Sequence, residues 1–246
     1  MMILTGKTIM SALRPPYPYG GEFVQQFLFT LRLCWFPLLV STIAFGYAAP
    51  GLQAGNFLIL FGALDRLGGF FVLASIREFS PFVCAIVLAG VAGTAITADL
   101  GARKIRDELD ALQVLGVDPV KNLVVPRFLA LMIATGLFNI YALILGIVGG
   151  MAASLTFKAP LGGFFSTLLT NASTVDLWGS AVKTTLFGAI IAIVCCYKGM
   201  TASGGAEGVG RAVNSAVVIA FTALFAFNYV FTQTLLATHP EISVIK

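Results

Sequence analysis

Long stretches without a charged residue dominate the chain. They cover residues 33–64, 79–98, 128–157, 184–197 and 212–240. A helix needs about 20 apolar residues to cross the hydrocarbon core of a bilayer. The stretch 184–197 reaches that length if its helix begins near Leu177 and Lys183 lies near the outer end, where the side chain can snorkel. The pattern predicts five membrane-spanning helices, near 33–53, 79–98, 127–156, 178–198 and 213–237.

The residues before the first predicted span form an amphipathic pattern. Phe23, Phe27, Leu28 and Leu31 fall on one face of a helix over residues 20–32. This pattern predicts a helix that lies in the membrane interface, and a simple extension of the first span is the alternative. The segment 66–78 is too short to cross alone, so we expect it to be a helical extension that leads into the second span.

Composition agrees with a membrane protein. Of the 246 residues, 58% are hydrophobic and 11% are charged, whereas soluble domains are about half apolar and about 25% charged. We therefore expect an all-α integral membrane protein with two parts. Residues 1–32 form a cytoplasmic tail with the interfacial helix, and residues 33–246 form the transmembrane domain.

The Lys and Arg residues indicate the orientation. With the N-terminus in the cytoplasm, ten of them fall in cytoplasmic segments and five in outer segments, as the positive-inside rule favours. This distribution explains the net charge of +4 without nucleic-acid binding, which we do not expect. We expect a multi-pass protein of the inner membrane.

Residues that could carry chemistry are few. Cys34, Cys84, Cys195 and Cys196 lie in apolar stretches, and the single histidine is His239. A metal site needs several such ligands at short spacing, and an enzyme needs a cluster of nucleophiles, bases or metal ligands. We therefore expect no metal, no cofactor and no catalytic residue in this chain.

The segment between the second and third predicted spans is the most informative. Its charges and apolar positions predict a short amphipathic helix over 100–115 that ends at Gly116 and Pro119. Arg103 with Asp107 and Arg106 with Asp110 are spaced as ion pairs on such a helix. A charged helix held between two spans suits docking into a groove of a cytoplasmic ATPase, and a solvated connecting helix is the alternative. The candidate coupling residues are Arg103, Lys104, Arg106, Asp107, Glu108, Leu109, Asp110 and Leu112.

Small residues recur at helical spacing in the second span. Ala85, Ala89 and Gly93 follow one another every four positions. Small residues allow two helices to approach closely in lipid. The pattern indicates either an interface with a second subunit or close packing within the chain.

Several motifs resemble the MlaE/YrbE family of ABC permeases. They are Arg77-Glu78 with Pro81, Ala111-Leu-Gln-Val-Leu-Gly-Val-Asp-Pro119 with Leu123-Val-Val-Pro-Arg127, and Ala202-Ser-Gly-Gly-Ala-Glu-Gly-Val-Gly-Arg211. The similarity covers roughly residues 75–235, and the Pro-Pro-Tyr-Pro-Tyr stretch at 15–19 is similar to the actinobacterial YrbE branch. The chain departs from the pattern at Phe79-Ser80, where many relatives have Leu-Gly, and at Asp99, where they have Glu.

The resemblance implies partners and a function. Members of this family pair as two permease chains, which can be the same or two YrbE paralogues, and they bind a dimer of cytoplasmic ATPases. They work with MCE-domain proteins that form a ring or tube, and they move lipids of the phospholipid, fatty acid or sterol class. The charged helix would be the coupling helix, with Asp99, Glu207 and Arg211 as further cytoplasmic contacts.

The lipid pathway and two other functions stay open at this point. Apolar side chains such as Phe45, Val87 and Phe225 could line a pathway or face the bilayer. An ion-coupled secondary transporter would need ionisable residues inside the spans, and residues 79–98, 128–157 and 212–240 have none except His239 at an end. A non-transporting membrane scaffold would not need the charged helix.

Overall fold

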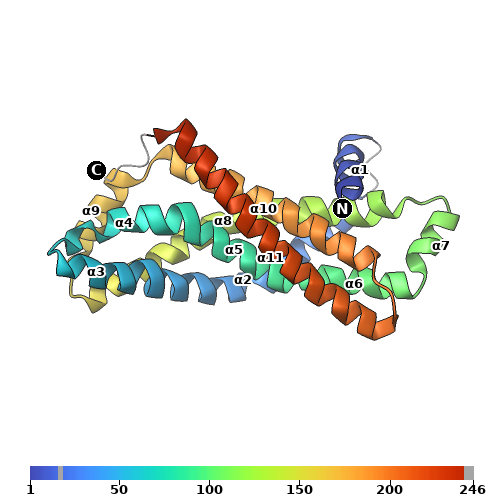
Figure 1. Cartoon of the computed structure of the whole chain (residues 1–246), viewed down its shortest axis with the longest axis horizontal. Helices are drawn as coiled ribbons and strands as arrows, with labels where there is room; N and C mark the ends of the chain where they lie inside the picture. Colours follow the sequence, from blue (N-terminus) through green and yellow to red (C-terminus); the bar gives the residue numbers. More distant parts are fainter. Residues whose placement is uncertain (16–18, 241–246) are drawn as a thin grey trace. The chain divides into compact units, whose positions relative to one another are not determined.

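The computed structural model describes residues 1–15 and 19–240, and these residues form helices without a β-strand (Figure 1). Residues 16–18, within the Pro-Pro-Tyr-Pro-Tyr stretch, and residues 241–246 lie outside the described residues. The chain divides into two compact units. The first contains residues 1–34, 85–135 and 185–226, and the second contains residues 35–84, 136–184 and 227 onward.

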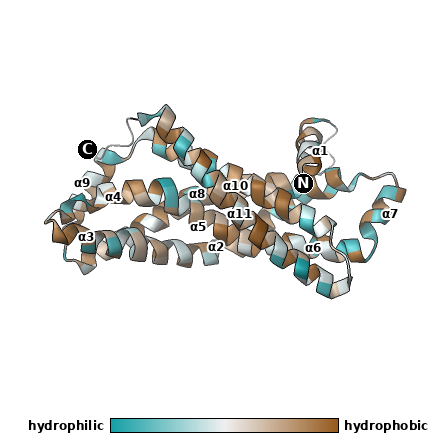
Figure 2. Cartoon of the chain, viewed as in Figure 1, coloured by the Kyte–Doolittle hydropathy of each residue, from teal (hydrophilic) through white to brown (hydrophobic). Residues whose placement is uncertain are grey.

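Five helical stretches of the described residues are long and apolar enough to cross a membrane, which confirms the predicted number. They are Gly20–Leu60, Leu64–Ile105, Val120–Thr156, Thr174–Met200 and Gly205–Thr238. Figure 2 shows hydrophobic residues along most of these helices and hydrophilic residues at α6, α7 and the beginning of α11. The helices are longer than the charge-free stretches, because they continue through the charged residues that bound each stretch.

The first two spanning stretches contain π-helical turns. The first consists of α2 (Gly20–Gly46), η1 (Tyr47–Gln53) and α3 (Ala54–Leu60). The second consists of η2 (Leu64–Arg66), α4 (Leu67–Phe71), η3 (Val72–Phe79), α5 (Ser80–Leu88), η4 (Ala89–Gly93) and α6 (Thr94–Ile105). Residues 66–78 are therefore the predicted helical extension. Of these turns, η1, η3 and η4 are π-helical, a rare geometry that is frequent at functional sites.

The remaining helices complete the chain. The third stretch joins the π-helical η5 (Val120–Val124) to α8 (Val125–Thr156), and the fourth and fifth are α10 (Thr174–Met200) and α11 (Gly205–Thr238). Three short helices lie outside these stretches, namely α1 (Met2–Leu13), α7 (Glu108–Val114) and α9 (Leu161–Asn171).

The short N-terminal helix is not where the amphipathic pattern placed it. The helix that precedes the spans is α1, and residues 20–32 are the first part of α2. No proline interrupts α2 before Pro37, so the amphipathic residues extend the first span, as the alternative interpretation held. After α1, Arg14 is extended with φ −98° and ψ 123°, which is the backbone conformation that a following proline favours.

The charged segment 100–115 is two helices rather than one. α6 continues from the second span to Ile105, and Asp107 then adopts φ 57° in the left-handed region. α7 begins after this residue, and Gly116 follows with φ 75°. Glycine adopts this conformation without strain, so the predicted end at Gly116 is confirmed.

The break at Asp107 changes the ion pairs. The left-handed residue interrupts the helical register, so Arg103 does not pair with Asp107 and Arg106 does not pair with Asp110. Lys104 instead pairs with Asp110 at 2.8 Å, and Arg106 pairs with Glu108 at 2.8 Å. These ion pairs hold α7 against the end of α6.

Glycines allow α2 and α8 to touch through their backbones in the second unit. A Cβ atom on Gly46 would lie 2.6 Å from the carbonyl oxygen of Gly146. A Cβ atom on Gly149 would lie 2.5 Å from the carbonyl oxygen of Ile43 and 2.7 Å from the nitrogen of Tyr47. Small residues at a membrane helix crossing serve this close approach.

The small residues of the second span pack within this chain. Ala85, Ala89 and Gly93 are buried, and a Cβ atom on Gly93 would lie 2.8 Å from the sulfur of Cys195 on α10. These residues therefore pack closely within one chain, as the alternative held, and their part in a subunit interface stays a prediction.

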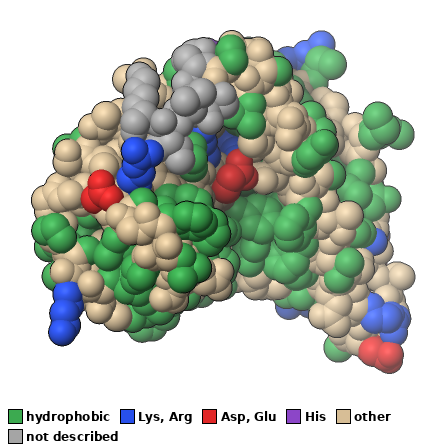
Figure 3. Space-filling view, turned by 60° about the vertical axis from the view of Figure 1, so that its left-hand side comes forward, with side chains coloured by type: hydrophobic (Ala, Val, Ile, Leu, Met, Phe, Trp, Pro, Cys, Tyr) green, Lys and Arg blue, Asp and Glu red, His purple; other side chains and the backbone are tan. Residues whose placement is uncertain are grey.

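The surface is apolar over much of the chain, as a lipid environment requires. Figure 3 shows a face on which hydrophobic side chains predominate and charged side chains are few. Large side chains such as Trp35, Phe36, Phe57 and Phe61 are exposed. Contiguous exposed apolar surface of this kind marks a membrane or protein contact.

Candidate functional site

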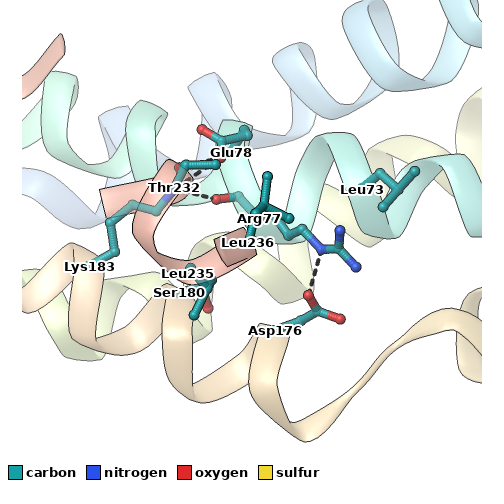
Figure 4. Close-up of a pocket in the computed structure, with 9 residues that line it drawn as sticks. All are labelled: Leu73, Arg77, Glu78, Asp176, Ser180, Lys183, Thr232, Leu235 and Leu236. Atoms are coloured by element: carbon teal, nitrogen blue, oxygen red, sulfur yellow. Dashed lines mark hydrogen bonds and ion pairs between the residues drawn. The ribbon is translucent and has the colours of Figure 1, made fainter. Parts of the chain in front are cut away.

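A buried lysine is the centre of a polar cluster in the second unit. Lys183 on α10 has only 2% of its side chain exposed. Its Nζ donates to the Arg77 carbonyl oxygen at 2.7 Å, the Thr232 hydroxyl at 3.0 Å and the Asn228 amide oxygen at 3.1 Å. It also pairs with the Glu78 carboxylate at 3.1 Å (Figure 4). The ammonium group on α10 is therefore engaged by acceptors of η3 and α11.

The carboxylate of Glu78 also accepts two hydrogen bonds from α11. Its Oε2 accepts from the Asn228 amide at 2.8 Å, and its Oε1 accepts from the Thr232 hydroxyl at 2.7 Å. The side chain of Glu78 is 33% exposed, unlike that of Lys183. Burial of an ion pair is tolerated only when such additional hydrogen bonds satisfy both partners.

The position of Lys183 corrects a prediction. The sequence placed this lysine near the outer end of its span, with its side chain reaching toward water. The structure places it among helices, because Glu78, Asn228 and Thr232 supply inside the chain what water would supply at the membrane surface. These partners lie 45 to 105 residues away in the sequence, so the apolar stretches alone did not indicate them.

A second ion pair lies beside the first. The Nε of Arg77 donates to Oδ1 of Asp176 at 2.5 Å. Oδ2 of Asp176 accepts from the backbone N–H and the hydroxyl of Ser173, and the Ser173 hydroxyl accepts from the backbone N–H of Asp176 at 3.2 Å. This reciprocal bonding is a capping box at the start of α10. The cap fixes the Asp176 carboxylate, which in turn fixes Arg77.

The two ion pairs line a small cavity of about 170 Å³. Charged and polar groups, Ser180 among them, line the cavity together with three leucines (Figure 4). Its lining residues are Leu73, Arg77, Glu78, Asp176, Ser180, Lys183, Thr232, Leu235 and Leu236. A cavity with a few fixed polar groups and an apolar wall suits a ligand that is itself part polar and part apolar.

The sequence contained one signal for this site. Lys183 is the only charged residue between Asp176 and Lys198. An ionisable residue inside a membrane segment is a functional candidate by default. Glu78 was noted only as part of the Arg77-Glu78 motif. Asp176, Asn228 and Thr232 were missed because nothing in the sequence connects them with Arg77 or Lys183.

The candidate coupling residues lie on the connection between the second and third spans. The side chain of Leu109 is buried in the chain, and Leu112 is half-buried. The most exposed apolar side chains of this connection are instead Val114, 88% exposed, and Leu115, 76% exposed. They end α7 and form an apolar tip that the amphipathic pattern did not single out.

The other candidate cytoplasmic contacts, Asp99, Glu207 and Arg211, are not part of the polar cluster around Lys183. Glu207 and Arg211 form an exposed ion pair of 2.8 Å, one turn apart near the beginning of α11. Asp99 lies on α6, where it pairs with Arg103 at 3.2 Å and with Arg127 at 2.6 Å. It is therefore engaged inside the chain, whether or not a partner contacts it.

The three candidates for a lipid pathway do not line the cavity described above. Phe45 and Phe225 are exposed, and Val87 is half-buried. The ring centroid of Phe45 lies 5.3 Å from that of Phe79. Their contact with lipid stays a prediction.

Comparison with known proteins places the sequence in one family. Residues 23–234 match the family described as permease MlaE. A probable ABC transporter permease of Rickettsia typhi is 31% identical over 230 residues, which cover 92% of this chain and 87% of that protein. The intermembrane phospholipid transport system permease protein MlaE of Haemophilus influenzae is 29% identical over 197 residues, or 79% of this chain and 75% of that protein.

A plant protein is also similar. The chloroplastic protein TRIGALACTOSYLDIACYLGLYCEROL 1 of Arabidopsis thaliana is 33% identical over 176 residues, which cover 70% of this chain and 49% of that protein. The match to the family runs from α2 to α11 and so includes all five of the spanning stretches described above. The expectation drawn from the motifs is confirmed, and the chain is a multi-pass membrane protein that belongs to the MlaE family of permeases.

Proposed function

We propose that this chain is the permease subunit of an ABC-type transporter that moves lipids across or out of the inner membrane. The observation that carries the proposal is the cavity at Glu78 and Lys183, where two ion pairs face leucines among the helices that span the membrane. A relative of this family is named for phospholipid transport, and we propose a substrate of the phospholipid, fatty acid or sterol class.

The chemistry of the cavity fits an amphiphile. A lipid headgroup carries charges or hydrogen-bonding groups, and these can exchange for the partners of Arg77 or Lys183 without leaving a bare charge in an apolar environment. The leucines at 235 and 236 can contact the acyl portion. At about 170 Å³, the cavity is smaller than the about 300–1,000 Å³ of typical ligand sites, so we infer that it holds only the polar end of the lipid.

The energy comes from a separate chain in this proposal. α7 carries an exposed apolar tip, Val114 and Leu115, beside the charged residues 103–110. Such a tip can enter an apolar groove of a soluble ATPase, while the flanking charges select the partner. The connection then lies in the cytoplasm, as does the N-terminus, and the chain itself contributes no catalytic residue.

The proposed assembly contains further chains. Two permease chains, identical or paralogous, pair in the membrane, and an ATPase dimer binds their cytoplasmic connections. MCE-domain proteins receive or deliver the lipid on the outer side. Glu207 and Arg211 at the beginning of α11 are additional sites for ATPase contact, because their ion pair is exposed.

One observation favours a second function. The ion pair of Glu78 and Lys183 is an ionisable pair among spanning helices, and such pairs also occur in ion-coupled transporters. Lipid movement that depends on a proton or sodium gradient, without any ATPase, would identify that function.

The test is co-purification with an ATPase. The chain is expressed with the neighbouring genes of its operon, solubilised in detergent and purified through a tag on this chain. The charges of Arg103, Arg106 and Glu108 are reversed together in a variant. A control variant, Lys158→Glu, reverses one exposed charge beyond the opposite end of α8. We expect the ATPase to accompany the unaltered chain and the control and to be lost from the triple variant. Absence of any ATPase from the unaltered chain would contradict the proposal.

A further inference from the structure

A buried arginine closes the connection that carries α7. The chain leaves the second span through α6, which contains Asp99, and returns through α8, in which Arg127 is the third residue. An Nη atom of Arg127 pairs with Oδ2 of Asp99 at 2.6 Å. The two ends of the connection 100–126 are therefore held together by one ion pair.

The same guanidinium contacts two further groups. One Nη donates to the carbonyl oxygen of Leu123 at 2.8 Å, in the π-helical turn before α8. The other Nη lies 3.5 Å from Oε1 of Glu22 near the beginning of α2. Only 1% of the Arg127 side chain is exposed. One guanidinium thus joins α2, α6 and α8 in the first unit.

These contacts restrain how the three helices can move. If the end of α6 separated from α8, Arg127 would remain as a buried cation with its main counter-ion removed, and breaking a buried pair in this way is strongly unfavourable. Displacement of α6 together with α8 and α2 preserves every contact. The geometry therefore favours movement of the connection and the three helix ends as one body.

We propose that Arg127 is a positioning residue that transmits the movement of α7 to α2, α6 and α8, through its contacts with Asp99 and Glu22. This inference rests on the proposed function, since it takes an ATPase as the source of the movement. This role differs from docking, because Arg127, Asp99 and Glu22 do not need to contact the ATPase. Arg127 affects the amount of lipid moved for each ATP hydrolysed, rather than binding of the ATPase.

The planar guanidinium is needed for this role. Its two Nη atoms reach different acceptors at the same time, whereas a lysine presents one compact ammonium group. Arg127→Lys keeps the charge but cannot make all the contacts of the guanidinium at the same time. Asp99→Asn keeps the shape and removes the counter-ion, and Glu22→Gln removes the charge that reaches from α2.

The experiment measures coupling in the assembled complex. The complex of this chain with its partner subunits is reconstituted in liposomes that contain a fluorescent phospholipid. ATP hydrolysis and movement of the labelled phospholipid are recorded together for each variant. Lys7→Gln is the matched control, because Lys7 also forms an ion pair with the connection, at 3.2 Å from Asp118, but that pair is exposed. The melting temperature of each complex is measured in parallel.

The expected result is a loss of coupling without a loss of assembly. Asp99→Asn, Glu22→Gln and Arg127→Lys should bind the ATPase and hydrolyse ATP, but move about five-fold less phospholipid per ATP or lower still. Asp99→Glu, which keeps the carboxylate, and Lys7→Gln should move as much phospholipid per ATP as the unaltered complex. Equal ratios in all variants, or hydrolysis and transport that fall in proportion with the melting temperature, would overturn the inference. Failure of the unaltered complex to move phospholipid with ATP contradicts the proposed function itself.

Discussion

Replacing Glu78 by glutamine leaves the ammonium group of Lys183 buried without a counter-ion. The side chain of Lys183 is 2% exposed. Its remaining partners, the Arg77 carbonyl, Asn228 and Thr232, are neutral acceptors. Removing one partner of a buried ion pair costs about 3–5 kcal/mol, and we expect Glu78→Gln to fall in this range.

Replacing Lys183 by methionine should cost less. Glu78 is 33% exposed and keeps its hydrogen bonds from Asn228 and Thr232, so its charge remains solvated. The Arg77 carbonyl and the Asn228 amide oxygen each lose the donor that Lys183 supplies, and an unsatisfied buried acceptor costs about 1–3 kcal/mol. The double variant removes both charges, so its loss should be smaller than the sum of the two single losses by about 2 kcal/mol.

The four cysteines provide the assay. None of them forms a disulfide and all are buried, so a fluorogenic maleimide reports their exposure as the protein unfolds in detergent. Lys198→Met, at the other end of α10, is the control and should change stability by less than about 0.5 kcal/mol. If Glu78→Gln unfolds at the same or a higher temperature than Lys183→Met, the claim that the buried Lys183 needs Glu78 as its counter-ion is refuted.

Three further predictions concern packing, docking and the capped aspartate. Gly149→Ala places a methyl group against the backbone of α2 and should destabilise the protein by about 1–3 kcal/mol. Gly90→Ala adds a carbon with no atom within 4 Å, so the stability should stay the same or rise by up to about 1 kcal/mol. Thermal unfolding measures the stability of both variants. Val114→Asp with Leu115→Asp should abolish co-purification of the ATPase without changing the melting temperature, because both side chains are exposed. Asp176→Ala removes the partner of a nearly buried arginine and should cost about 3 kcal/mol, while an unchanged melting temperature would contradict the role of this ion pair.

The five spans could be predicted because their signal is local. A stretch of about 20 apolar residues has few alternatives to a membrane helix, and each of the five stretches contributed one. The ends were less predictable, because a helix continues past the first charge wherever that charge finds a partner. Residues 20–32 show this, since Glu22 is within 4 Å of the buried Arg127 and belongs to the first span.

The connection shows a limit of periodicity. The spacing of apolar residues from 100 to 115 fits one helix, and the structure has two. The interruption depends on one residue, Asp107, in the left-handed conformation, which aspartate adopts more readily than most residues. The spacing of apolar residues does not indicate such a residue, so the ion pairs predicted across Asp107 were wrong. The helix end at Gly116 could be predicted because glycine often follows the last residue of a helix.

The polar cluster depends on contacts between distant residues. Lys183 and Glu78 are separated by 105 residues, and nothing in the sequence shows that they pair. Only their pairing makes them a candidate site. The small residues Ala85, Ala89 and Gly93 illustrate the same limit, because the sequence shows that a helix will approach them closely but does not say which helix.

The most direct test of the central claim is phospholipid transfer by the purified complex in liposomes, with ATP or with an ion gradient as the only energy source. The proposed function predicts transfer that requires ATP and is lost when the ATPase cannot hydrolyse it. Transfer that proceeds without ATP and follows a proton or sodium gradient would contradict it and identify this chain as an ion-coupled transporter.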